Sequence, residues 1–198
     1  MDTTHLIVTF MTSLILIQLQ VLPVTSQSNL PGCQVADIAF VVDSSDSILP
    51  EYWENIKQFL ISFVDALTIG PDAVQIGLIQ YSSNANMPTF YLFDFQTKQE
   101  IIDAIDQIEN IGSQTNTAAG LDLLVSHMFV SSNGDRSIAP NIAIVLTDGQ
   151  SNVRTEDLQS SADTAKLRGK CKNINNMFLF FQRSGKSNLV FRIQIRVE

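Results

Sequence analysis

The pattern of apolar residues predicts four strands in the first three quarters of the chain. Residues 36–42 and 141–147 are nearly continuous apolar runs with the length of a buried parallel strand, and an aspartate follows each of them. Residues 74–81 predict another strand. Residues 89–95 follow after a short polar loop, so we expect them to form a strand antiparallel to it.

Helices are expected between these strands, because apolar residues recur there at helical spacing. Pro50 suits the first position of one helix, and Thr97 with Glu100 forms a capping box at the start of the next. A third helix follows Thr115, and residues 155–168 form a fourth. The side chains expected to face the core are Trp53, Ile56, Leu60, Phe63, Val64, Leu67, Ile101, Ile102, Ile105, Ile108, Leu121, Leu124, Val125, Met128, Phe129, Leu158, Ala162, Ala165 and Leu167.

This alternation predicts an α/β fold, a three-layer open and mostly parallel sheet with helices on both faces. Ligands of such sheets bind outside the carboxyl ends of the strands. Asp43 and Asp148 each come at the end of an expected strand, so the two carboxylates are expected at the same edge although they lie far apart in the sequence.

Composition restricts the class of protein. Of the 198 residues 45% are hydrophobic and only 16% are charged, which is typical of a globular chain rather than a disordered one. The net charge of −8 argues against a nucleic-acid partner, because phosphates demand a basic surface. The charged residues after Gly169 are mostly basic, so the rest of the chain carries a more negative net charge than the whole.

Residues 1–26 are interpreted as a cleaved secretory signal peptide, with an apolar run followed by the small residues of 24–26. The alternative is a membrane anchor, which is disfavoured because Gln18 and Gln20 interrupt the run and no basic stop-transfer segment follows. No later segment is long and apolar enough to span a bilayer. Residues 27–35 form a short polar leader.

Secretion permits a disulfide between Cys33 and Cys171, the two cysteines of the chain. Two thiols that never meet are the alternative, and the sequence leaves both open.

Three short polar segments carry oxygen ligands for a hard divalent cation. They are residues 43–47, 114–117 and 146–151, and each lies where a strand ends or a helix begins. Two carboxylates and three hydroxyls drawn from these segments would make an oxygen-only site, the ligand chemistry that suits Mg²⁺ or Mn²⁺. Taken singly, Ser47 or Thr115 could be a helix cap, and the aspartates could be turn residues. The joint pattern favours a cation site.

The stretches Asp37–Ile48, Gly112–Leu121 and Ile142–Ser151 resemble the von Willebrand factor type A domain with its metal-ion-dependent adhesion site. Residues 74–82 resemble the second strand of that family. The resemblance runs from about Cys33 to Gly169. The sequence of these stretches is more similar to extracellular-matrix members, such as type VI collagen chains and matrilins, than to the inserted domains of integrins.

The resemblance implies a function and a set of ligands. It implies a domain over residues 36–170 in a secreted adhesion or extracellular-matrix module. The cation, Mg²⁺ or Mn²⁺, would keep one position for an acidic residue of an extracellular protein ligand such as collagen or another matrix protein. The residues implied as its ligands are Asp43, Ser45, Ser47, Thr115 and Asp148.

Residues 171–198 depart from the family pattern, which would continue with further buried strands and a helix. Residues 177–181 and 189–197 could instead form a β-hairpin. The tail is either an alternative ending or the product of a truncated transcript or an incorrect gene model. An alternative ending would supply substitute strands, whereas in a truncated or incorrect product the strand 141–147 is expected to be an exposed sheet edge.

Two other functions compete with adhesion. An enzyme is disfavoured because the mature chain has one histidine, His127, and lacks the nucleophile-elbow, zinc-protease and phosphate-loop motifs. A structural matrix component, or a truncated fragment of this family, would not need the cation. Capture of a partner that survives chelation would distinguish that alternative.

Overall fold

The structure is a computed structural model that describes residues 35–147, 151–167 and 178–181. The expected signal peptide, the leader up to residue 34, both cysteines, Asp148 and most of the tail lie outside the described residues. Within those three ranges, no helix is long and apolar enough to cross a membrane.

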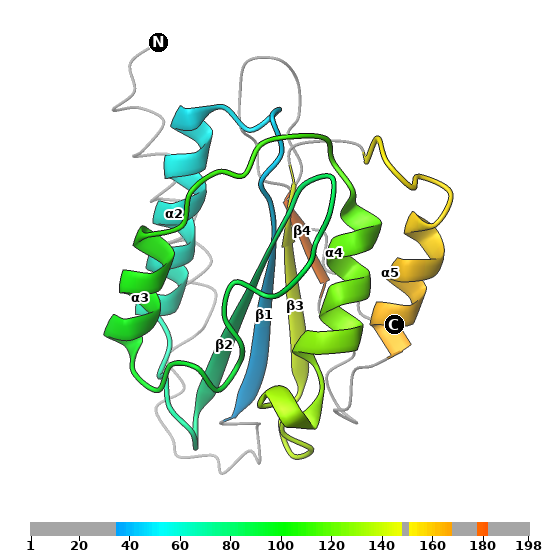
Figure 1. Cartoon of the computed structure of the whole chain (residues 1–198). Helices are drawn as coiled ribbons and strands as arrows, with labels where there is room; N and C mark the ends of the chain where they lie inside the picture. Colours follow the sequence, from blue (N-terminus) through cyan, green and yellow to red (C-terminus); the bar gives the residue numbers. More distant parts are fainter. Residues whose placement is uncertain (1–34, 148–150, 168–177, 182–198) are drawn as a thin grey trace, which may run out of the picture. The chain divides into compact units, whose positions relative to one another are not determined.

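The sheet has four described strands, all parallel, in the order β2-β1-β3-β4 (Figure 1). The register places Asp43 opposite Tyr81 and Val42 opposite Leu146, so the strands end together at one edge. The predicted fold class is therefore confirmed. The strands are β1 (Ala36–Asp43), β2 (Val74–Tyr81), β3 (Asn141–Leu146) and β4 (Phe178–Phe181).

Helices cover both faces of the sheet (Figure 1). On one face, α2 (Pro50–Asp65) and α3 (Lys98–Asp106) pack over a core that includes Phe40 of β1. On the other, α4 (Thr117–Leu123), the π-helical turn η1 (Leu124–Met128) and α5 (Leu158–Leu167) pack over a core that includes Val41. A 3₁₀ turn, η2 (Ser131–Asn133), precedes β3. Because β1 is buried on both faces, its sequence is apolar at successive positions rather than at alternate ones.

The local helix signals mostly hold. Pro50 opens α2, and the Thr97–Glu100 capping box is present at the start of α3. The helix expected after Thr115 begins at Thr117 and continues into the π-helical turn, which the spacing did not predict. The helix expected from residue 155 begins at Leu158, after a turn.

The strand predicted over residues 89–95 is wrong. Only one antiparallel bridge joins this segment to β2, between Phe90 and Leu78. The chain then turns, with the Asp94 carboxylate accepting the Tyr91 N–H at 2.7 Å. Phe90 packs in the core under α2 and α3, whereas Leu92 packs in the core under α4. A strand would point both side chains to one face, so the turn allows the segment to supply both cores.

Strand β4 changes the expectation for the sheet edge. It lies parallel to β3, with Ala143 opposite Phe178, so β3 is an interior strand among those described. The exposed edge expected at residues 141–147 is therefore wrong. The residues 189–197 of the predicted hairpin lie outside the described part of the chain.

A buried ion pair connects segments at the amino-terminal ends of the strands. Asp37 of β1 is fully buried, and its Oδ1 lies 2.7 Å from the guanidinium of Arg136. The same guanidinium donates to the carbonyls of Ala36 and Ala73 at 2.9 Å, so it ties the loop before β3 to β1 and to the segment before β2. Burial raises the pKa of Asp37, and the hydrogen bonds from Arg136 oppose that shift.

We expect Arg136→Ala to lower the free energy of unfolding by about 3–5 kcal/mol, because it leaves a buried carboxylate without its cation. Lys98→Ala is the matched control, since Lys98 pairs with Asp65 at the surface and such pairs contribute about 1 kcal/mol or less. Urea unfolding of both variants measures the difference. An equal loss of unfolding free energy in Arg136→Ala and Lys98→Ala would contradict this role of the ion pair.

Candidate metal centre

Asp43, the last residue of β1, has a fully buried carboxylate that two hydrogen bonds orient. Its Oδ1 accepts the backbone N–H of Ser45 at 3.0 Å, and its Oδ2 accepts the hydroxyl of Thr147 at 2.8 Å. Thr147 directly follows β3, so this second bond joins the ends of two neighbouring strands. The arrangement fixes both carboxylate oxygens at the carboxyl edge of the sheet.

Ser45 and Ser47 bring two hydroxyls together in the loop after Asp43. Their Oγ atoms lie 3.0 Å apart, and Ser45 is buried whereas Ser47 is exposed. Ser47 does not cap α2, because the N-cap position belongs to Leu49 and has no side-chain hydrogen bond. The helix-cap interpretation of Ser47 is therefore wrong, and its hydroxyl lies beside that of Ser45.

Ser44 holds this loop in place through hydrogen bonds to the loop after α3. Its Oγ donates to Asn110 Oδ1 at 2.9 Å and accepts the Ile111 N–H at 2.7 Å, while its carbonyl accepts the Gly112 N–H at 2.8 Å. Gly112 has a left-handed φ of 77°, and a Cβ there would lie 2.7 Å from a carboxylate oxygen of Asp46. Both features favour glycine where the loop after α3 approaches the loop after β1.

Thr115 is buried between the loops that follow β2 and β3. Its N–H donates to Asn152 Oδ1 at 2.9 Å, and its carbonyl accepts the N–H of Asn152 at 2.9 Å and that of Val153 at 3.1 Å. The next residue, Asn116, donates its N–H to the Ser82 carbonyl and caps α4 by accepting the Ala119 N–H. The cap is therefore Asn116, and the interpretation of Thr115 as the cap is wrong.

The structure thus places three of the five sequence-predicted residues, Asp43, Ser45 and Ser47, in one hydrogen-bonded loop. It holds Thr115 against the residues that follow Asp148, while Asp148 itself lies outside the described residues. No group of three His, Cys, Asp or Glu side chains gathers within the described ranges. A cation at this edge would therefore depend on hydroxyl oxygens beside Asp43.

Sequence reasoning missed the residues that support this edge. Ser44 and Asn110 are 66 residues apart, and Thr115 and Asn152 are 37 apart, so no local pattern links them. Thr147 lay inside a predicted site segment, yet its bond to Asp43 depends on the pairing of β1 with β3. Only the sheet topology could have indicated these contacts.

His127 lies beside a serine in the π-helical turn. The Ser126 Oγ is 2.8 Å from His127 Nδ1, and the same hydroxyl donates to the Asp122 carbonyl at 2.7 Å. Both side chains are exposed. The hydroxyl has one proton for these two contacts, so the tautomer of His127 decides which of them it serves.

Comparisons with known proteins match most of the chain. A family model described as the von Willebrand factor type A domain matches residues 37–184, beyond the expected limit at Gly169. Matrilin-1 of Gallus gallus is 34% identical over 134 residues, which cover 66% of this chain and 27% of that protein. The collagen alpha-6(VI) chain of Homo sapiens is 42% identical over 115 residues, which cover 58% of this chain and 5% of that one.

A solved structure is also similar. Proximal thread matrix protein 1 from the mussel byssus, with a zinc-occupied MIDAS motif, has a TM-score of 0.66 and 25% identity over 75% of this chain and 38% of its own. This chain spans less than a third of the length of either curated relative.

We expect Ser44→Ala to lower the free energy of unfolding by about 1–3 kcal/mol without added metal, because it removes the acceptor of the Ile111 N–H and one of the two donors to Asn110 Oδ1. Ser47→Ala is the control, since removal of an exposed hydroxyl costs about 0.5 kcal/mol or less. Urea unfolding in EDTA compares them. A Ser44→Ala variant as stable as Ser47→Ala would refute the supporting role of Ser44.

Proposed function

The chain belongs to the von Willebrand factor type A domain family, and we propose that it is an adhesion module that binds a protein ligand through a divalent cation. The observation that carries this proposal is the pair of hydroxyls at the buried carboxylate of Asp43. Ser45 and Ser47 present their Oγ atoms 3.0 Å apart, directly after the end of the central strand β1.

We propose Asp43, Ser45, Ser47, Thr115 and Asp148 as the cation ligands. The described donors fit a hard cation, because they are a carboxylate and hydroxyls with oxygen as the only ligand atom. Two hydrogen bonds already orient Asp43, so its carboxylate needs little reorganisation to bind a metal. Mg²⁺ or Mn²⁺ is the cation that we propose.

The ligand is proposed to be an extracellular protein that offers an acidic residue. Neutral hydroxyls donate little charge, so a cation held by them would still attract an external carboxylate. The names of the similar proteins support a matrix setting, since they include a collagen chain and a thread matrix protein. We accordingly propose secretion, an extracellular-matrix location, and collagen or another matrix protein as the partner.

The proposal assigns no catalytic role to the chain. The described serine and histidine that lie together, Ser126 and His127, are both exposed, and the serine hydroxyl also bonds the Asp122 carbonyl. The alternative to cation-dependent adhesion is a structural matrix component that does not need the metal.

Mg²⁺ should raise the melting temperature of the chain, because a cation that binds only the folded state stabilises it, by about 2.7 kcal/mol at a hundred times its Kd. Ser45→Ala should reduce or abolish that shift. Ser44→Ala is the comparison variant. It should melt lower in EDTA and weaken the shift less than Ser45→Ala does, because its hydroxyl binds Asn110 and Ile111 and only supports the loop.

Differential scanning calorimetry with Mg²⁺ and with EDTA makes this comparison. Loss of the metal-dependent shift in both serine variants would mean that the loop as a whole, and not the Ser45 hydroxyl, is required.

Capture on immobilised collagen tests the adhesive role. We expect binding in Mg²⁺, loss of binding in EDTA, and loss in Asp148→Ala even with Mg²⁺ present, because the proposed ligand set would be incomplete. Surface plasmon resonance measures all three. Capture that survives EDTA would favour the structural component over cation-dependent adhesion.

A further inference from the structure

A cluster of charged and hydroxyl side chains, here called the Arg154 clamp, joins the loop after β3 to helices α4 and α5. It consists of Arg154, Asp122, Asp157 and Ser161. We propose that the clamp holds residues 151–154 against Thr115 and thereby sets the affinity of the site for its cation. This inference rests on the proposed function and assigns positioning residues to it.

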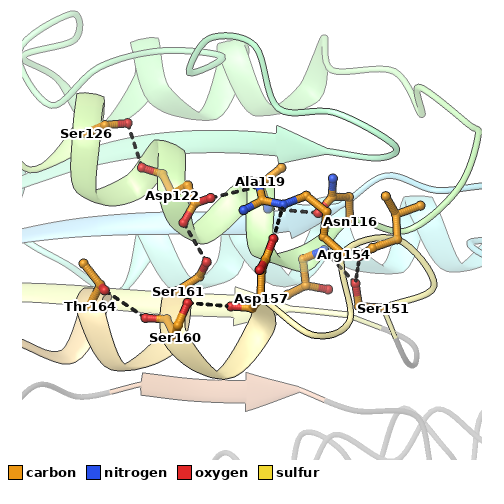
Figure 2. A network of polar contacts seen from close by, with 12 residues as sticks. Asn116, Ala119, Asp122, Ser126, Ser151, Arg154, Asp157, Ser160, Ser161 and Thr164 are labelled. Carbon is orange, nitrogen blue, oxygen red and sulfur yellow. Dashed lines mark hydrogen bonds and ion pairs between the residues drawn. The ribbon is translucent and has the colours of Figure 1, made fainter.

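Figure 2 shows Arg154 between carboxylates from two elements. Its Nε donates to Asp157 Oδ2 at 2.8 Å, and its Nη1 donates to Asp122 Oδ2 at 3.0 Å. The other oxygen of Asp122 accepts the hydroxyl of Ser161 at 2.7 Å. Asp122 lies on α4, Ser161 lies on α5 and Asp157 directly precedes α5, so the planar guanidinium connects both helices to the loop.

The backbone of Arg154 indicates that its side chain is held in place. Its φ is 50°, in the left-handed region that residues with a Cβ seldom adopt. The Asp157 N–H donates to the Arg154 carbonyl at 3.1 Å, which closes the turn that leads into α5. Glycine would adopt this φ without strain, so an arginine here gives up backbone stability that its side-chain contacts offset.

The same short loop reaches the proposed cation site at its other end. Asn152 and Val153 donate their N–H groups to the Thr115 carbonyl, and Asn152 Oδ1 accepts the Thr115 N–H. The Ser151 hydroxyl lies within 3.2 Å of the Thr115 carbonyl. Asp148 precedes Ser151 by three positions in the sequence. The loop is therefore attached to one proposed ligand and adjoins another, and the clamp fixes its far end.

The exposure of the clamp's charged side chains indicates that they position the loop rather than stabilise the whole fold. The charged side chains of the clamp are 41–45% exposed, and ion pairs of that exposure contribute little to global stability. Groups that orient metal ligands, in contrast, typically change metal affinity by about 10–100-fold when they are replaced. Loss of the clamp should therefore affect cation affinity more than unfolding.

Arg154→Gly is the decisive variant, because it removes the side chain and relieves the left-handed backbone at once. We expect it to keep the urea midpoint of the wild type and to bind Mg²⁺ about tenfold more weakly by calorimetric titration. Asp122→Asn, which preserves the shape of the side chain and removes its charge, should also lower the affinity for Mg²⁺. Gln159→Ala is the control, since the Gln159 side chain donates to Asp163 within α5, away from the loop.

A second readout needs no metal. In EDTA, amide hydrogen exchange of Asn152 and Val153 should be faster in Arg154→Gly than in Gln159→Ala, because these N–H groups bind the Thr115 carbonyl. If wild type binds Mg²⁺ and Arg154→Gly binds it equally well, the clamp inference is wrong and the proposed function stands. If wild type does not bind Mg²⁺, the proposed function fails and the inference fails with it.

Discussion

The buried carboxylate of Asp43 is the group around which the carboxyl edge of the sheet is organised. It accepts a hydrogen bond from the loop that follows it and another from Thr147, which is 104 residues away. That second bond exists because β1 pairs in parallel with β3, so both strands end at the same level. The loops after β1, after β3 and before α4 therefore reach one place, although they are distant in the sequence.

Strand β1 carries two buried aspartates on the same side of the sheet, and the two carboxylates have different partners. Asp37, at the amino edge, pairs with the guanidinium of Arg136, which is a permanent joint between segments. Asp43, at the carboxyl edge, accepts bonds from a backbone N–H and a hydroxyl. These two neutral donors orient the Asp43 carboxylate, and an oriented carboxylate suits a proposed cation ligand.

Local sequence patterns predicted the parts of the fold that depend on nearby residues. The apolar runs of β1, β2 and β3, Pro50 at the start of α2, and the Thr97–Glu100 capping box are all encoded within a few positions. The strand predicted over residues 89–95 was wrong, because Phe90 and Leu92 pack in cores on opposite faces of the sheet.

The candidate site was predictable as a set of residue types, but the contacts that support it were not. The bonds of Ser44 to Asn110 and of Arg154 to Asp122 join residues 66 and 32 positions apart. The left-handed φ of Arg154 also has no signal in its residue type, since such positions favour glycine. These features arise from tertiary packing, which brings helix and loop residues together after the sheet has formed.

Paramagnetic broadening by Mn²⁺ in an amide NMR spectrum of the full chain is the most direct test of the cation site. A bound Mn²⁺ broadens the signals of nearby nuclei most strongly. The account predicts that substoichiometric Mn²⁺ broadens first the amides of Ser45, Ser47 and Thr115, while that of Asp37, at the opposite edge of the sheet, stays sharp. Uniform broadening, or broadening centred on another part of the chain, would contradict it.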